Sequence, residues 1–400
     1  MSISKKIGLE VLLTTFYNLL SLVLKKISGL IITIFLVRII SIESFGDFME
    51  VILSSSFAMS FSTAYLGISL IKIISKEPEN TLKANELFTE SLIHWFFWCV
   101  FYAVIVVCFS LNYFTVFLLP IISLEFMLES YFLARKKSNL LPKLALVKIF
   151  FVMLLVFWVK FIDDNNLIEK YIFCMFSYLI VFLLYAKYSL GLGFNYRHKL
   201  QFDYRKLILP AFISRVPVAS VNYIVVTKIV AGLGSTSMAI FAVAMQSRII
   251  IDSIAVVIGK TALPMLSNKI NGDVKEYHSV LKYVILMNVV SSVIILLILL
   301  SFGSFLPHLF NMGGDELAYK TILYFCFGSV ISILTSTAGS YLASSNQMWV
   351  GAALNILWSV IYISFVLYAA KSVDEIAMCW FYSYLVYLFV ILIWLYRRKF

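Results

Sequence analysis

Residues 11–37 read VLLTTFYNLLSLVLKKISGLIITIFLV, an apolar stretch that is interrupted near its centre by Lys25 and Lys26. An α-helix needs roughly 20 apolar residues to cross the hydrocarbon core of a bilayer, so the stretch predicts a membrane span. It is too long and too polar for a cleaved signal peptide. We therefore expect the first span to remain in the protein, with two lysines at membrane depth.

Similar apolar stretches recur along all 400 residues, of which 62% are hydrophobic and only 13% are charged. The mean hydropathy is +0.96, a value that a water-exposed surface would not tolerate. Within lipid only helices and closed barrels satisfy the backbone, and stretches of this length are helical. We predict an all-α membrane protein with about 12 transmembrane helices, at residues 11–37, 46–71, 88–110, 114–134, 140–160, 168–187, 207–231, 238–262, 279–303, 319–342, 347–370 and 376–396.

The basic residues of the connections are distributed unevenly between the two sides of the membrane. With the N-terminus inside, 20 of them fall on the inner side. The outer side has five, namely Arg38, Lys160, Lys170, Lys320 and Lys371. Because positive charge favours the cytoplasmic side, both termini are predicted to be cytoplasmic. This bias also accounts for the formal charge of +11, so we expect no nucleic-acid partner.

The longest inner connection, residues 188–206, falls between the sixth and seventh spans. Transporters are often built from two related bundles around a central path. We therefore predict an N-terminal six-helix bundle at 1–190, a cytoplasmic linker at 191–206 and a C-terminal six-helix bundle at 207–400. A central cavity is expected between the bundles.

The sequence lacks the features that several classes of enzyme would need. The chain has no GxxxxGK[ST] motif, no Ser/His/Asp arrangement and no long outer loop that could hold a donor and an acceptor. Its five cysteines lie in apolar stretches without CxxC or histidine spacing. We predict that the protein is not an enzyme and has neither a metal site nor a cofactor.

Ionisable residues within the predicted spans are the strongest indication of function, because each costs about 2.5–3.5 kcal/mol at the centre of a membrane helix. Such residues are expected to face protein or water. The cations are Lys25, Lys26, Lys148, Arg215, Lys228, Arg248 and Lys260, and the acids are Glu50, Glu90, Glu125, Glu129 and Asp252.

The first span carries polar residues at spacings of four, three, four and three, which place them on one face of a helix. This stripe consists of Thr14, Asn18, Ser21, Lys25 and Ser28. It predicts that Lys25 lines a cavity. The alternative is a structural ion pair between Lys25 and Glu125 or Glu129.

Glu125 and Glu129 share one face of the fourth span and would repel each other in a low dielectric unless one is protonated or cations lie between them. They are candidates for proton coupling, or counter-ions for Lys25, Lys26 and Lys148. Lys148 lies at a depth in the membrane similar to that of Arg215. Instead of facing a cavity, its long side chain can extend to the membrane surface.

Arg248 and Asp252 have the i, i+4 spacing of a helical ion pair. The pair can be purely structural or part of a binding site, and the sequence leaves both alternatives open. Between Lys282 and Lys371 the spans hold no ionisable residue outside the outer loop. The excess of cations within the spans favours an anionic substrate, and the uncharged C-terminal spans would give a long-chain anion apolar room.

The segment 35–48, FLVRIISIESFGDF, resembles the junction of the first two spans in polysaccharide flippases. The two central lysines, Leu66-Gly67, and 262–264 (Ala-Leu-Pro) fit the same family. The chain is thus similar to Wzx-type O-antigen and capsular polysaccharide flippases, within the multidrug/oligosaccharidyl-lipid/polysaccharide exporter superfamily. It departs from them at Ser41, where glycine is usual, and at Thr227, where many members carry Asp before a lysine.

This resemblance implies a flippase that moves undecaprenyl-diphosphate-linked oligosaccharide, an O-antigen or capsule unit, from the inner to the outer leaflet of the bacterial cytoplasmic (inner) membrane. It implies alternating access driven by an H⁺ or Na⁺ gradient and a role in polysaccharide or lipopolysaccharide biosynthesis. A polysaccharide polymerase and a chain-length regulator are the protein partners that it suggests.

The intramembrane charges then take two roles. Cations suit a diphosphate because charge-assisted hydrogen bonds replace its lost hydration. The expected substrate-binding residues are Lys25, Lys26, Lys148, Arg215 and Arg248. The expected ion-coupling residues are Glu125, Glu129 and Asp252. A drug or cation antiporter of the same superfamily would need an acid-dominated cavity, and a membrane oligosaccharide polymerase would need a long outer loop with essential Arg or His.

Overall fold

The computed structural model describes residues 3–74, 77–108, 112–161, 166–195, 209–269, 274–345 and 347–397. All regular elements in these ranges are helices, which confirms the predicted all-α fold. Eleven helical segments in them are long and apolar enough to cross a membrane. The predicted span 46–71 is instead a broken helix, because α2 (Ile42–Ser62) and α3 (Ala64–Ile74) meet at Thr63.

By their packing the residues form two compact units, 1–39 with 51–223 and 40–50 with 224–400. The division of the chain into bundles 1–190 and 207–400 stays a prediction. Most of its expected linker, from residue 196 onward, lies outside the described residues.

The first unit contains most of the helices of the N-terminal part of the chain. α1 packs against α6, while α5 packs against α3, α4 and α7. Pro120 lies inside α5. The remaining bounds in this part are α1 (Ile3–Ile39), α4 (Thr81–Cys108), α5 (Phe114–Ala134), η1 (Ser138–Leu140), α6 (Leu141–Phe161), α7 (Leu167–Leu190) and α8 (Leu209–Ile224).

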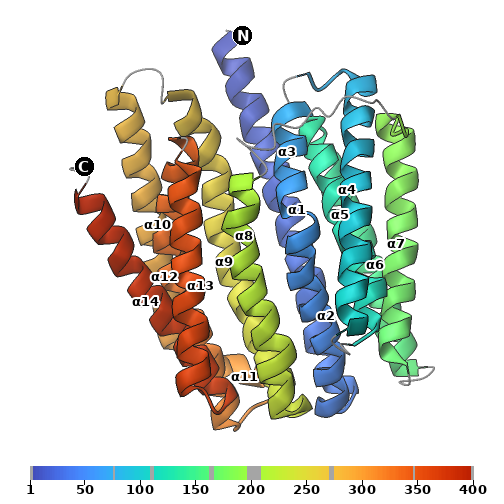
Figure 1. Cartoon of the computed structure of the whole chain (residues 1–400), viewed down its shortest axis with the longest axis vertical. Coiled ribbons are helices and arrows are strands. Elements are labelled where there is room, and N and C mark those ends of the chain that lie inside the picture. Colours follow the sequence, from blue (N-terminus) through green and yellow to red (C-terminus); the bar gives the residue numbers. More distant parts are fainter. Residues whose placement is uncertain are drawn as a thin grey trace. The chain divides into compact units, whose positions relative to one another are not determined.

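The second unit is organised around α12, which packs most extensively against α9 and α14 and also against α10 (Figure 1). Residues 238–245 of α9 are buried without interruption, as expected for a helix that is surrounded by others. The bounds are η3, a π-helix (Val225–Val230), η4 (Ala231–Leu233), α9 (Ser235–Lys269), α10 (Val274–Phe302), η5 (Gly303–Phe305), α11 (Leu306–Leu309), α12 (Glu316–Ser344), α13 (Met348–Ala369) and α14 (Val373–Arg397).

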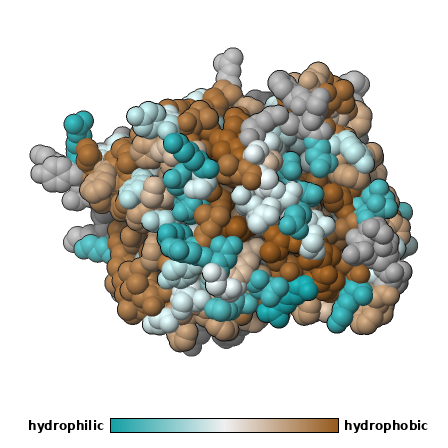
Figure 2. All heavy atoms as spheres, turned by 90° about the horizontal axis from the view of Figure 1, so that it is seen from below, coloured by the Kyte–Doolittle hydropathy of each residue, from teal (hydrophilic) through white to brown (hydrophobic). Residues whose placement is uncertain are grey.

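The surface has the polarity expected of a membrane protein. Figure 2 shows hydrophilic residues spread between hydrophobic ones over one end face. Exposed polar residues such as Asp315 and Glu316 lie at the start of α12, and the Asp315 carboxylate caps that helix by accepting from the N–H groups of Leu317 and Ala318. Along α10, by contrast, the exposed side chains are mainly large hydrophobic ones, as contact with lipid requires.

The start of α2 explains the Phe-Gly motif. Ser41 acts as the helix cap, because its Oγ accepts a 3.2 Å hydrogen bond from the Ser44 N–H, which replaces the usual glycine turn with a side-chain cap. Phe45 is fully buried. Ser235 at the start of α9 donates a hydrogen bond to the Asp47 carboxylate, and Gly46 lies directly against the Ser235 carbonyl. Gly46 is thus the residue that permits this close backbone approach.

Gly46→Ala is expected to lower the free energy of unfolding by about 1–3 kcal/mol, the usual cost of overpacking. The added Cβ would lie 1.9 Å from the Ser235 carbonyl oxygen, so the two backbones must separate. Thermal unfolding in detergent measures the effect. Gly339→Ala is the control, because a Cβ at this position of α12 would meet nothing within 4 Å. Equal stability of the two variants would contradict the close contact.

Candidate functional site

Helix α5 takes part in two ion pairs, and the pair of Glu125 is the more deeply buried one. The Lys148 Nζ of α6 lies 2.8 Å from both carboxylate oxygens of Glu125. The Glu125 side chain is 8% exposed and that of Lys148 is 19% exposed. The same ammonium group lies 5.7 Å from the centre of the Tyr178 ring of α7. Lys148 therefore ends at a carboxylate inside the helix packing.

The second pair lies one helical turn further along α5. Lys25 of α1 forms an ion pair with Glu129, and both side chains are only about one fifth exposed. The two carboxylates of α5 are thus each neutralised by a lysine from a different helix. This arrangement removes the repulsion that their i, i+4 spacing would otherwise cause.

The described part of the polar stripe on α1 faces protein. Ser21 and Ser28 are buried, and the Ser28 hydroxyl donates a 2.6 Å hydrogen bond to the Lys25 carbonyl. The side chains of Thr14 and Asn18 lie outside the described residues. Ser21 and Ser28 are therefore enclosed by protein, and Lys25 between them forms an ion pair with Glu129, the alternative that the sequence analysis gave to a cavity lining.

The other two expected cations of this unit have different surroundings. Lys26 is partly buried on α1, next to Lys25. Arg215 is exposed on α8, two residues before Pro217. An exposed guanidinium within a candidate membrane span must meet lipid headgroups, water or a ligand. The binding role of both residues stays a prediction.

In the second unit, Arg248 and Asp252 form the ion pair that their spacing permits. The Arg248 Nε lies 3.0 Å from Asp252 Oδ2. The other carboxylate oxygen accepts a 2.8 Å hydrogen bond from the Ser332 hydroxyl of α12. Both oxygens of Asp252 are therefore engaged, one within α9 and one by the neighbouring helix.

The Arg248 guanidinium lies against one ring of an aromatic cluster that sequence reasoning missed. Its carbon lies 3.6 Å from the centre of the Trp380 ring, which is a stacking distance. The cluster comprises Trp358, Tyr362, Trp380 and Tyr384. Trp358 and Tyr362 have i, i+4 spacing on α13, as do Trp380 and Tyr384 on α14. This spacing is the signal by which the sequence could have indicated the cluster.

Gly328 of α12 allows Trp380 to take this position. A Cβ on Gly328 would lie 2.6 Å from Trp380 Cδ1, so any larger residue would push the indole away. The absence of a side chain at this point therefore fixes the ring against which Arg248 is stacked.

The ion pairs Lys25–Glu129, Lys148–Glu125 and Arg248–Asp252 share one chemical property. Each joins a cation within a candidate membrane span to a carboxylate. A phosphate group can take over such a cation because guanidinium and ammonium groups bind phosphate and carboxylate in the same way. Among the described residues, no three His, Cys, Asp or Glu side chains lie close enough together to hold a metal ion.

The helices and their apolar spans define a multi-pass helical membrane protein. The structure of the MATE multidrug transporter DinF-BH is similar with a TM-score of 0.72 at 12% identity, over 97% of this chain and 95% of that one. An inward-facing multidrug resistance MATE family transporter of the MOP superfamily gives 0.67 at 14% identity, over 96% and 94%. An outward-facing one gives 0.62 at 13% identity, over 97% and 95%.

At this identity the likeness shows the fold alone, which is that of MATE transporters of the MOP superfamily. Neither a protein-family model nor a curated protein matches the sequence. The sequence resemblance suggested the Wzx-type family, which belongs to the same superfamily as these solved structures.

Glu125→Gln is expected to destabilise the protein by about 3–5 kcal/mol, because it leaves the Lys148 ammonium group buried without a counter-charge. The double variant Glu125→Gln/Lys148→Met should recover most of this loss. Thermal unfolding measures both variants. Glu316→Gln is the control, since its pair with Lys320 is at the surface and contributes little. Additive losses in the double variant would show that the two residues do not act as a pair.

Arg248→Lys is expected to cost about 1–2 kcal/mol of stability, although it keeps the charge. A lysine can pair with Asp252 but lacks the planar group that stacks on Trp380. Thermal unfolding, together with the near-ultraviolet circular dichroism of the tryptophans, reports the change. Arg397→Lys, at an exposed position in the last turn of α14, is the matched control. Identical spectra and stabilities for both variants would contradict the stacking.

Proposed function

We propose that this protein is a flippase that moves undecaprenyl-diphosphate-linked oligosaccharide from the inner to the outer leaflet of a bacterial cytoplasmic membrane. The cargo has an anionic diphosphate, a hydrophilic glycan and a long isoprenoid chain. The fold is that of membrane transporters, which supports a transport function over an enzymatic one. The sequence resemblance around Phe45-Gly46 supports this particular cargo.

The observation that carries the proposal is the pairing of intramembrane cations with carboxylates, above all Lys25 with Glu129. Both side chains of this pair are partly exposed. In the pair of Lys148 with Glu125, by contrast, the carboxylate is buried. A diphosphate that reaches Lys25 can therefore compete with Glu129 for the ammonium group. Lys26, Lys148 and Arg215, all in the first unit, would add charge to this diphosphate. The predicted binding role of Arg248, in the second unit, is a separate contact.

This exchange also offers a route to ion coupling. When the diphosphate takes Lys25, the Glu129 carboxylate loses its counter-charge within the membrane. A buried carboxylate without a partner is costly, so it takes up H⁺ or Na⁺. Cargo binding and ion binding are thereby linked at one position. Glu125 and Asp252 could act in the same way on Lys148 and Arg248.

A drug or cation antiporter is the second candidate, because the similar solved structures are multidrug transporters. In that case the carboxylates Glu125, Glu129 and Asp252 would bind the cationic drug, and the lysines would be their resting partners. The two candidates differ in the role of the cations, which bind the cargo in the flippase but only pair with the carboxylates in the antiporter.

Lys25→Gln is expected to reduce flipping by about tenfold or more, the value of one charge-assisted contact to phosphate. The assay is translocation of a lipid-linked oligosaccharide in proteoliposomes. Because the single change also leaves Glu129 unpaired, the variant Lys25→Gln/Glu129→Gln, which keeps a neutral hydrogen-bonding pair, tests whether the ion pair only holds the helices together. It should unfold like the wild type and still fail to transport. Lys160→Gln, at an exposed position near the end of α6, is the matched control.

Restored flipping in the double variant would mean that the pair only holds the helices together, and the diphosphate role of Lys25 would be lost. Wild-type protein that exports a cationic dye but not the lipid-linked oligosaccharide would favour the antiporter. In that case Glu129→Gln should abolish export of the dye, whereas Lys25→Gln should leave most of it.

A further inference from the structure

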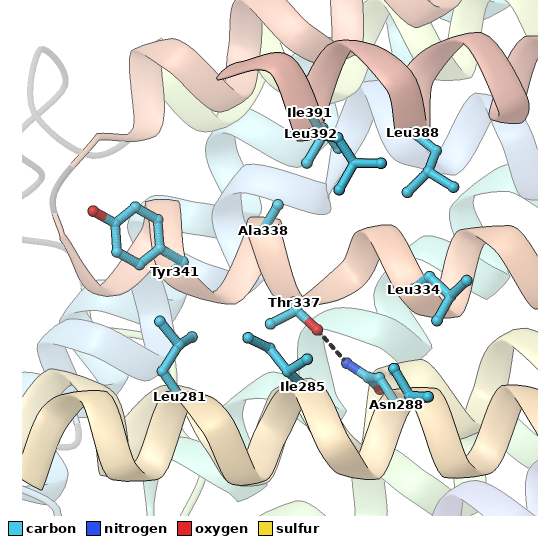
Figure 3. Close-up of a pocket in the computed structure, with 11 residues that line it drawn as sticks. Leu281, Ile285, Asn288, Leu334, Thr337, Ala338, Tyr341, Leu388, Ile391 and Leu392 are labelled. Atoms are coloured by element: carbon cyan, nitrogen blue, oxygen red, sulfur yellow. Dashed lines mark hydrogen bonds between the residues drawn. The ribbon is translucent and has the colours of Figure 1, made fainter. Parts of the chain in front are cut away.

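A groove with a volume of about 440 Å³ lies in the second unit, between α10, α12 and α14 (Figure 3). α10 contributes Ile285 and Val289, α12 contributes Leu334 and Ala338, and α14 contributes Leu388 and Leu392. The site proposed for cargo uses none of these residues.

The groove has exposed rims and a buried floor. On the rims Val289 is 42% exposed and Leu392 is 51% exposed, whereas Ala338 on the floor is buried. The Asn288 amide donates a 2.6 Å hydrogen bond to the Thr337 hydroxyl, so these polar groups bind each other across α10 and α12. The surface that remains for a ligand is almost entirely hydrocarbon. Such a surface fits an alkyl chain.

The groove is lined by residues of candidate membrane spans and ends near the boundary of one of them. Its lining residues on α10 and α14 fall within the candidate spans Leu281–Leu309 and Val373–Trp394. Tyr341 lies at one end of the groove and just beyond the span of α12, where it contacts Trp394 with the ring centres 6.2 Å apart. Tyrosine and tryptophan are enriched at membrane interfaces. This pair therefore marks the headgroup end of the groove.

A positive charge lies at that same end. Lys282 is exposed and directly follows Leu281, which lines the groove beside Tyr341 in Figure 3. Basic residues near the membrane surface attract anionic lipid headgroups. Apolar walls with a cation at the interface end are complementary to a lipid that has one negative charge and a long chain.

We propose that this groove is a binding site for an anionic phospholipid, with one acyl chain between α10 and α14 and the phosphate beside Lys282. The site does not depend on the proposed cargo, because a membrane supplies this lipid whatever the protein transports. The bound chain covers the exposed rims and completes the packing of α10 against α14.

The test compares two variants that differ only in whether they fill the groove. Val289 lines it, whereas the adjacent Val290 does not and is exposed to a similar extent, 47%. The wild type, Val289→Phe and Val290→Phe are reconstituted in nanodiscs of phosphatidylglycerol and phosphatidylethanolamine. Lipid that stays bound after transfer to mild detergent is counted by native mass spectrometry.

The wild type and Val290→Phe should retain one phosphatidylglycerol in preference to phosphatidylethanolamine, and Val289→Phe should lose this retention several-fold. Lys282→Gln should keep a lipid but lose the preference for phosphatidylglycerol, whereas the control Lys371→Gln should not. Equal retention by Val289→Phe and Val290→Phe would overturn the site. A polyisoprenyl phosphate that displaces phosphatidylglycerol would assign the groove to a cargo chain and would equally overturn the phospholipid proposal.

Discussion

The structure depends above all on the need to neutralise charge where water is absent. A single unpaired charge in the bilayer costs several kcal/mol, so an acid beside a buried cation stabilises the fold strongly. Helix α5 meets this need twice, with Glu125 bound to Lys148 and Glu129 to Lys25. The two pairs fix the register of α1 and α6 on α5, and the extensive packing of α1 against α6 agrees with that arrangement.

The second unit solves the same problem differently. Arg248 keeps its charge by combining an ion pair with Asp252 and a flat contact with Trp380, which only a planar guanidinium can make at 3.6 Å. Gly328 gives the indole room, and Ser332 orients the carboxylate. The charge is thus held by three helices, α9, α12 and α14. A change in the packing of any one of them would alter the environment of the pair.

These pairs differ in how readily a ligand could open them, and that difference carries the functional argument. Glu125 is closed to a greater degree than Glu129, so the pair of Glu129 with Lys25 is the better candidate for exchange with an anion. The apolar groove of α10, α12 and α14 adds a separate site for a lipid chain. The exchangeable ion pair joins α1 and α5, whereas the apolar groove is formed by α10, α12 and α14. An anionic group and an alkyl chain would therefore contact different helices.

The sequence by itself determined that this protein is helical, that it crosses a membrane many times and that Arg248 can reach Asp252. Apolar length and i, i+4 spacing are properties of one helix, and both can be found without knowing its neighbours. Only the tertiary structure decided that Lys25 meets Glu129 while Lys148 meets Glu125, and that Trp380 stacks on Arg248. Each of these contacts joins different helices, and their register depends on packing that no local pattern encodes. The break at Thr63 and the cap at Ser41 were likewise decided by the backbone geometry of α2.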